Sequence, residues 1–285
     1  PLIIHVPDSS WLARYCEDVP PEAYALAEKF WPGPLTMILP RKPIVPLRTT
    51  GGLETVGVRC PNHPITRAVI AAADVPIAAP SGNTSGRPSP TCIADMIEDM
   101  DGKIEGMFDG GPCAVGVEST IIDVTEETPT ILRPGHITKD MIAKVIGTVQ
   151  MDAGLSGLDP SVKPKAPGMK YRHYAPKASM TVIQGEKEAV IRRIEELAAE
   201  YPKEKVGILA ADETLSCYTH GQVVSAGSRN EHTIEQGLYR ALREFDHMGV
   251  SVIFSESFAD DDRSEAIMIR LLKAAGQKIE YLSDK

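Results

Sequence analysis

Hydrophobic and polar positions form short blocks over the first half of the chain. Apolar runs bounded by Gly, Pro or Asp are typical of strands, and they occur at Val56–Arg59, Pro76–Ala79, Met107–Phe108 and Ser119–Val124. Apolar residues at helical spacing occur at Pro20–Phe30, Pro64–Ala73 and Thr91–Met100. The pattern therefore predicts a mixed α/β domain over residues 1–150.

After residue 178 the pattern becomes a regular alternation. Strands are predicted at Met180–Ile183, Lys205–Ala210, Gln222–Ser225 and Val250–Phe254. Helices are predicted at Lys187–Glu200, Thr233–Met248 and Ser264–Ala275. Strands that alternate with helices of this length favour a small parallel, Rossmann-like sheet, so residues 179–285 are predicted to form a second, smaller α/β domain. It has no Gly-x-Gly-x-x-Gly phosphate loop, which argues against a dinucleotide there.

Residues 151–178 lie between the two predicted domains and have no periodicity. Gly, Pro, Ser and Lys dominate, as in a linker. Within it, residues 163–177 carry five Lys or Arg side chains and no Asp or Glu. Tyr171, Arg172 and His173 give this segment more aromatic and basic groups than a passive tether needs.

Composition narrows the class of protein. A length of 285 residues suits two domains, and the net charge of −9 argues against a large basic surface for nucleic acid. No apolar run approaches the roughly 18 residues that span a bilayer, so we expect no membrane contact. The five cysteines have no metal-ligand spacing, which argues against a zinc site or a disulfide framework and favours the cytoplasm. The chain starts with Pro1 inside a strand-like run, and we expect that an N-terminal segment is missing.

The segment Ala79–Ser89 is the first candidate for chemistry. It follows a predicted strand and combines hydroxyl groups, two glycines, Asn83 and Arg87. Glycines let backbone N–H groups approach an anion closely, and hydroxyls such as those of Ser81 and Ser89 donate further hydrogen bonds. The composition fits a phosphate or carboxylate site, but composition alone favours a solvated loop.

Three further segments contain candidates. Thr55 and Arg59 are expected on the same face of a strand, opposite Val56 and Val58, because strand side chains alternate. Such a polar face lines a cleft or meets solvent. Ser119 at a strand start either holds a carboxylate or forms a turn. Arg133, before Pro134 and Gly135, suits phosphate recognition, although a purely structural arginine is equally consistent with the sequence.

The order of these motifs is more specific than any one of them. The chain contains, in sequence, Phe30-Trp31-Pro32-Gly33-Pro34-Leu35-Thr36, Val56-Gly57-Val58-Arg59-Cys60-Pro61, Ser81-Gly82-Asn83-Thr84-Ser85-Gly86, Val117-Glu118-Ser119-Thr120 and Leu132-Arg133-Pro134-Gly135. Together they resemble the YrdC-like family, the threonylcarbamoyl-AMP synthases. The segment Ala166–Pro176 and the alternating domain after it resemble the linker and C-terminal domain of the larger, two-domain members.

This resemblance implies a YrdC-like twisted mixed sheet with helices and a smaller Rossmann-like domain. It implies formation of threonylcarbamoyl-AMP and pyrophosphate from L-threonine, bicarbonate and ATP, for modification of tRNA next to the anticodon. The positions that match ATP contacts are Thr55, Ser81, Asn83, Ser89 and Arg133, with Tyr171 and His173 as lid contacts. The positions that match L-threonine contacts are His5, Arg59, Ala79 and Ser119. We assign no residue as general acid or base and no protein ligand to a metal, and we expect Mg²⁺ to bind through the ATP phosphates.

Two other functions remain open at this stage. YrdC-like domains also suggest a non-catalytic RNA-binding module, which the basic linker favours and the acidic remainder opposes. A carbamoyl transferase with a YrdC-like domain would require zinc-finger segments, and no suitable cysteine spacing occurs. RNA and tRNA-modification proteins are possible partners. The family's Lys-x-Arg element, expected upstream of Pro1, is absent from this sequence.

Overall fold

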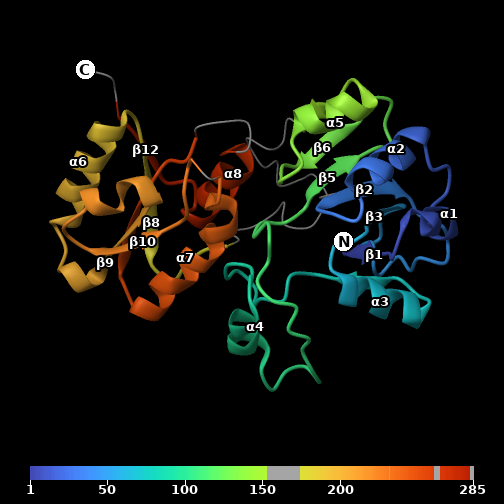
Figure 1. Cartoon of the computed structure of the whole chain (residues 1–285), viewed down its shortest axis with the longest axis horizontal. Helices are drawn as coiled ribbons and strands as arrows, with labels where there is room; N and C mark the ends of the chain where they lie inside the picture. The colour runs from blue at the N-terminus through green and yellow to red at the C-terminus, as the bar shows by residue number, and fades with distance from the viewer. Residues whose placement is uncertain (153–173, 231, 260–263, 283–285) are drawn as a thin grey trace. The chain divides into compact units, whose positions relative to one another are not determined.

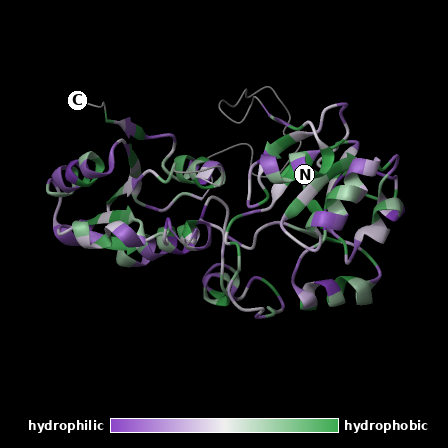
Figure 2. Cartoon of the chain, turned by 45° about the horizontal axis from the view of Figure 1, so that its top comes forward, coloured by the Kyte–Doolittle hydropathy of each residue, from purple (hydrophilic) through white to green (hydrophobic). Residues whose placement is uncertain are grey.

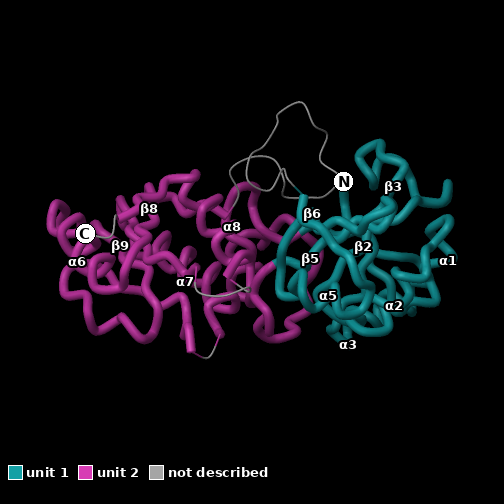
Figure 3. The backbone as a smooth tube through the Cα atoms, turned by 90° about the horizontal axis from the view of Figure 1, so that it is seen from above, with its two compact units in different colours: residues 1–80, 118–171 teal, residues 81–117, 172–285 magenta. Residues whose placement is uncertain are grey.

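The computed structural model describes residues 1–152, 174–230, 232–259 and 264–282. They form two compact units, shown in different colours in Figure 3. Unit 1 comprises the described residues within 1–80 and 118–171, and unit 2 those within 81–117 and 172–285. Residues 81–117 come before the last strands of unit 1 in the sequence, but they pack with the C-terminal residues.

Unit 1 is built on a seven-stranded sheet in the order β4-β1-β3-β2-β5-β6-β7. Its strands are β1 (Ile3–His5), β2 (Leu35–Pro40), β3 (Thr55–Arg59), β4 (Ile77–Ala79), β5 (Thr120–Asp123), β6 (Thr130–Arg133) and β7 (Gln150–Met151). Parallel and antiparallel pairs both occur: β1 runs parallel to β3, whereas β2 runs antiparallel to it. The predicted mixed sheet is confirmed.

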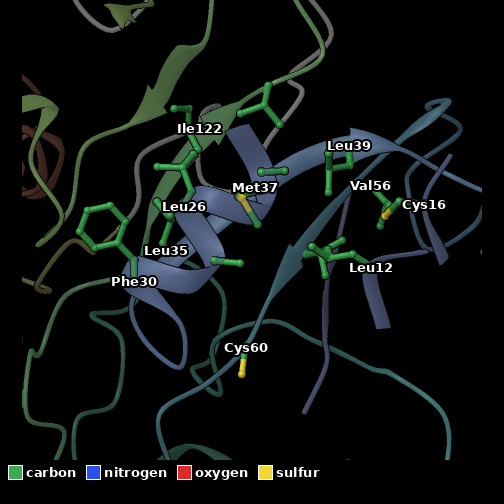
Figure 4. Close-up of a cluster of buried hydrophobic side chains, with 14 of the residues drawn as sticks. Leu12, Cys16, Leu26, Phe30, Leu35, Met37, Leu39, Val56, Cys60 and Ile122 are labelled. Carbon is green, nitrogen blue, oxygen red and sulfur yellow. The ribbon is translucent and has the colours of Figure 1, made fainter. Parts of the chain in front are cut away.

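One face of this sheet carries the hydrophobic core of unit 1. The helices of the unit are α1 (Leu12–Tyr15), α2 (Pro21–Phe30), α3 (Pro64–Ala73) and α5 (Lys139–Ile146). Leu26 and Phe30 of α2 pack with Met37 and Val56 from the strands (Figure 4). Val58 joins the same core. Thr55 and Arg59 alternate with these buried valines along β3, so the predicted polar face of this strand is confirmed.

Unit 2 is built on a five-stranded sheet in the order β10-β9-β11-β8-β12, in which every pair is parallel. Its strands are β8 (Ser179–Gln184), β9 (Val206–Ala210), β10 (Gln222–Ser225), β11 (Val252–Glu256) and β12 (Ile279–Tyr281). Its helices are α4 (Ile93–Met100), α6 (Lys187–Ala198), α7 (Ile234–Met248) and α8 (Ser264–Ala274), labelled in Figure 1. This arrangement confirms the predicted Rossmann-like domain. Its helices carry both hydrophilic and hydrophobic residues (Figure 2), as expected for helices with one buried face.

One predicted strand is wrong. Met107 and Phe108 lie in irregular structure, and the Phe108 side chain is 81% exposed. Two apolar residues between Gly106 and Asp109 offer too few backbone groups to pair with a neighbouring strand. Within the described residues, no helix is long and apolar enough to cross a membrane.

Candidate functional site

A row of polar side chains lies on the face of the unit 1 sheet opposite the hydrophobic core. His5 at the end of β1 is in register with Arg59 at the end of β3, and Arg59 is in register with Thr36 of β2. Residues paired across neighbouring strands point to the same face of a sheet. We call His5, Arg59, Thr36, Ser119 and Arg133 the polar row, and the last two residues join it as follows.

Ser119 connects β2 with β6. Its hydroxyl oxygen lies 2.8 Å from the Thr36 Oγ1 atom. The Arg133 guanidinium donates from Nε to the Ser119 carbonyl oxygen at 3.0 Å and from Nη2 to the Ser119 hydroxyl oxygen at 3.1 Å. All three residues are buried, with exposed fractions of 0% for Thr36, 2% for Ser119 and 8% for Arg133. A partner for Arg133 is not evident from the sequence, and the structure identifies it as Ser119.

The Ser119 hydroxyl keeps the capacity for one more hydrogen bond. A serine hydroxyl has one donor and two acceptor positions. Arg133 and Thr36 take two of these three positions, whichever of Ser119 and Thr36 donates to the other. The third position can therefore serve a ligand.

Gly135 allows the turn after Arg133 to lie against Ser119. A Cβ atom at this position would lie 2.5 Å from the Thr120 backbone nitrogen and 2.8 Å from the Glu118 carbonyl oxygen. These are backbone atoms, which cannot move aside as a side chain can. The glycine of the Leu132–Gly135 motif is thus required by the close approach of two chain segments that build the polar row.

His5 is a neutral hydrogen-bond acceptor. Burial, followed by the positive charge of Arg59, lowers the pKa of His5 to about 4. Its Nδ1 atom lies 3.1 Å from the carbonyl oxygen of Ile77 in β4. The ring also hydrogen-bonds to the backbone of Ile3. A carbonyl oxygen only accepts, so in the neutral ring Nδ1 carries the proton that faces Ile77 and Nε2 is the acceptor nitrogen.

Arg59 and Thr55 lie at opposite ends of β3. The Arg59 Nε atom donates to the carbonyl oxygen of Gly33 at 3.2 Å, which orients the guanidinium. Thr55 is four residues earlier on the same face, about 13 Å away at the usual strand rise. This separation exceeds the length of an amino acid and suits two ligands, or one as long as a nucleotide.

Ala79, the remaining candidate for threonine, ends β4. It is in register with Ile3 of β1, and Ile77 of the same strand is in register with His5. The structure thus places His5, Arg59 and Ala79 on the neighbouring strands β1, β3 and β4, and Ser119 directly before β5 of the same sheet. Thr55 lies on β3 and Arg133 on β6.

The other nucleotide candidates lie in unit 2. Ser81, Asn83 and Ser89 belong to residues 81–89, which we call the serine–glycine loop. The Asn83 amide donates to the carbonyl oxygens of Thr84 and Arg87 at 3.0 and 3.3 Å, so it shapes this loop. Ser81 is exposed and Ser89 is buried. Tyr171 and His173 lie outside the described residues.

Sequence reasoning missed three residues that the structure places at these sites. Thr36 stands in a quoted motif but received no role, because a threonine inside an apolar strand is usual. Asp99 and Arg243 hold the serine–glycine loop, as described below. Arg243 directly follows Leu242 and lies four residues after Tyr239, so a charged residue on the apolar side of a helix was the available signal.

Fold and site together define a class: a two-domain α/β protein whose first sheet carries a row of polar and basic side chains on one face. Two family models match the chain. One described as telomere recombination matches residues 1–135, and one described as threonylcarbamoyl-AMP synthase, C-terminal domain, matches residues 137–276.

Known proteins resemble the chain over nearly its whole length. The threonylcarbamoyl-AMP synthase of Bacillus subtilis (strain 168) is 46% identical over 283 residues, or 98% of this chain and 80% of that protein. The synthase of Schizosaccharomyces pombe is 34% identical over 98% of this chain and 77% of its own length. The crystal structure of Pyrococcus abyssi Sua5 complexed with L-threonine matches with a TM-score of 0.92 and 44% identity, over 99% of this chain and 82% of that one. The chain belongs to the family of threonylcarbamoyl-AMP synthases.

Proposed function

We propose that this chain is an L-threonylcarbamoyladenylate synthase, a nucleotidyltransferase that forms threonylcarbamoyl-AMP and pyrophosphate from L-threonine, bicarbonate and ATP. Family membership supports this function. The polar row is the observation that connects the function to particular residues. Two arginines, one neutral histidine and a buried serine hydroxyl lie along one face of a single sheet, on its strands or, for Ser119, directly before β5. The product serves the threonylcarbamoyladenosine modification of tRNA.

L-threonine binds, in this proposal, to His5, Arg59, Ala79 and Ser119. The Arg59 guanidinium and the third hydrogen-bonding position of the Ser119 hydroxyl suit the carboxylate of the amino acid. The Nε2 atom of His5 accepts a hydrogen bond from the amine or hydroxyl of threonine. The low pKa of His5 matters here because a protonated imidazole would repel an ammonium group and lack the acceptor.

ATP binds to Thr55, Arg133 and the serine–glycine loop with Ser81, Asn83 and Ser89. Tyr171 and His173 complete this set as lid residues and lie outside the described part of the chain. Hydroxyls, amides and arginine are donors that suit phosphate oxygens rather than metal ligands. Among the described residues, no group of three or more His, Cys, Asp or Glu side chains could hold a metal ion. In this proposal Mg²⁺ would be held mainly by the ATP phosphates, whose charge it would neutralise.

The reaction needs alignment more than a strong base. The threonine amine attacks the carbon of bicarbonate, and loss of water leaves a carbamate. A carbamate oxygen then attacks the α-phosphorus of ATP, the bond from that phosphorus to the bridging oxygen breaks, and pyrophosphate leaves with the electron pair. The arginines stabilise the charge on the transferring phosphoryl group and hold the two anionic substrates side by side. No side chain is assigned as general acid or base.

We also propose domain boundaries, a cellular compartment and macromolecular partners for the enzyme. The catalytic domain extends over residues 1–150, the linker over 151–178 and the C-terminal domain over 179–285. All five cysteines are free thiols, which is the usual state in the reducing cytoplasm. RNA or tRNA-modification proteins are its proposed macromolecular partners.

Calorimetry on the full-length protein tests the proposed function. L-threonine should bind, and its affinity should rise in the presence of a non-hydrolysable ATP analogue. Arg59→Met should weaken threonine binding about tenfold or more, because a charge-assisted bond to the carboxylate is lost. The matched control is Arg14→Met, which removes an exposed arginine of the same unit that pairs with Asp74 and lies over the rings of Trp11 and Tyr15. Absence of binding by either ligand would contradict the proposal, and retained RNA binding would then favour the non-catalytic module.

A further inference from the structure

Arg243 of α7 is a buried arginine whose hydrogen bonds lead to the serine–glycine loop and to α4. Its exposed fraction is 1%. It donates to the carbonyl oxygen of Pro88 from Nη2 at 2.8 Å and from Nε at 3.2 Å. It also donates to both carboxylate oxygens of Asp99 in α4, at 2.8 and 3.3 Å.

Asp99 extends this contact to the other half of the loop. Its side chain is fully buried and accepts a hydrogen bond from the backbone nitrogen of Thr84 at 2.9 Å. It also pairs with Arg87, which belongs to the loop itself. Burial alone would raise the pKa of Asp99, but the hydrogen bonds from Arg243 and Thr84 and the two positive charges lower it below the ordinary value. Asp99 is therefore ionised at neutral pH, and it joins Thr84 to Arg243.

The same helix holds both ends of the segment 81–117. Near the start of α7, the Gln236 side chain donates to the carbonyl oxygen of Cys113 at 3.4 Å. Gly116 approaches so closely that a Cβ atom there would lie 2.5 Å from the Gln236 Cα atom. Gln236 and Arg243 are two helical turns apart. α7 thus supports this segment along its length, rather than at one chance contact.

The chain after residue 173 meets the loop at the same place. The backbone nitrogen of Ala175 donates to the carbonyl oxygen of Gly86 at 3.0 Å. The Asp246 carboxylate, on α7, accepts from the backbone nitrogen of Lys177 at 2.7 Å and lies 3.8 Å from the Arg87 guanidinium. Gly86 and Arg87 therefore lie among contacts from α4, α7 and residues 175–177.

This network is poorly explained as a device for stability alone. Burying an arginine and a carboxylate carries a desolvation cost that their attraction repays only in part, and apolar side chains often hold a helix equally well. What the Arg243–Asp99 ion pair adds is a fixed orientation of the loop backbone. Its bonds end on the backbone oxygen of Pro88 and the backbone nitrogen of Thr84, one on each side of Gly86.

We infer that Arg243 is a positioning residue for ATP binding: acting with Asp99, it fixes the conformation of the loop that carries Ser81, Asn83 and Ser89. The inference rests on the proposed function, in which these residues contact ATP. The C-terminal domain then contributes to the nucleotide subsite through α7, although Arg243 itself touches no substrate. Threonine binding, which uses His5, Arg59, Ala79 and Ser119 of unit 1, does not depend on it.

The test compares two ligands on the full-length protein. Arg243→Met should weaken binding of a non-hydrolysable ATP analogue about tenfold or more, because the loop loses several charge-assisted bonds. The affinity for L-threonine, measured without nucleotide, should change less than about twofold. Arg243→Lys keeps a charge beside Asp99 but cannot reach Pro88 and both carboxylate oxygens together. Arg243→Lys should weaken binding of the analogue about threefold or more and leave the affinity for L-threonine unchanged. If Arg243→Met does not fold, Arg243→Lys provides the test.

The matched control is Arg229→Met. Arg229 is a half-buried arginine of the same unit, bonded to Glu256 at 3.0 Å and to the carbonyl oxygen of Ser257 at 2.7 Å. The Arg229→Met variant should have a lower melting temperature than the unmodified protein but the same affinity for the analogue. Wild-type ATP affinity in a folded Arg243 variant would overturn the inference, and so would an equal loss in Arg229→Met, which would reveal a general effect of stability. If the unmodified protein binds no nucleotide, the proposed function fails instead, so the two failures are distinguishable.

Discussion

The Arg133 guanidinium and Ser119 form a two-point contact in which Nε donates to the serine carbonyl oxygen at 3.0 Å and Nη2 to its hydroxyl oxygen at 3.1 Å. This contact fixes the start of β5 against β6 and sets the direction of the Ser119 hydroxyl. A residue that matches an ATP contact thereby orients one that matches a threonine contact. Under the proposed function, this pair links the ATP site to the threonine site.

Arg133→Met should therefore lower both folding stability and ligand affinity. The buried Ser119 loses its charge-assisted partner, which typically costs roughly 1.5–3 kcal/mol of unfolding free energy. ATP affinity should fall, and threonine affinity should fall less. Urea unfolding and calorimetry measure the two effects. A variant that loses stability but keeps wild-type ATP affinity would show that Arg133 has only a structural role.

Gly135→Ala should damage the same site through sterics. The added methyl group meets backbone atoms of Glu118 and Thr120, and relief of such overlap costs roughly 1–3 kcal/mol. Urea unfolding should show this loss, and calorimetry should show weaker threonine binding. Gly106→Ala is the control, because its methyl group would enter open space and should change stability by less than about 0.5 kcal/mol. Equal stability of the two variants would contradict the close approach.

His5 should make folding stability depend on pH in an acidic window. Its pKa is lowered from 6.5 to about 4 on folding, so the unfolded chain binds the extra proton between these values. The free energy of unfolding should fall as pH drops from 6.5 to 4, by on the order of 3 kcal/mol, and this contribution should be constant above that window.

Comparison with His5→Gln isolates this contribution from those of the carboxylates. The difference in unfolding free energy between the two proteins should vary with pH between 4 and 6.5 and level off above. A difference that stays constant across that range would mean that the His5 pKa is unperturbed by folding.

The cysteines should differ in reactivity because their burial differs. Cys113 and Cys217 are exposed, whereas burial raises the pKa of the Cys60 thiol above its ordinary value and raises that of Cys16 to about 12. A thiol-specific chromogenic reagent at neutral pH should modify Cys113 and Cys217 rapidly and Cys16 and Cys60 only after denaturation. The variant with Cys113→Ser and Cys217→Ser is the control and should lose the rapid phase. Rapid modification of Cys16 in the native protein would contradict its buried position.

Local patterns in the sequence were sufficient for most elements. The alternation of Thr55, Val56 and Val58 predicted the two faces of β3, because the side-chain period of a strand is a property of the backbone alone. The helical spacing at Pro21–Phe30 and the alternation after residue 178 are local in the same sense. The two-residue run at Met107 failed because a strand also needs a partner, and nothing in so short a segment specifies one.

The sequence by itself determined the family, the two kinds of sheet and the residue types at the site, because motif order and periodicity are properties of the linear sequence. Only the tertiary structure decided which residues meet. It placed Ser119 between Thr36 and Arg133, and it joined the serine–glycine loop to α7 through Asp99 and Arg243. A buried charge requires a partner, but Arg243 and Asp99 are far apart in sequence, and the fold alone brings them together.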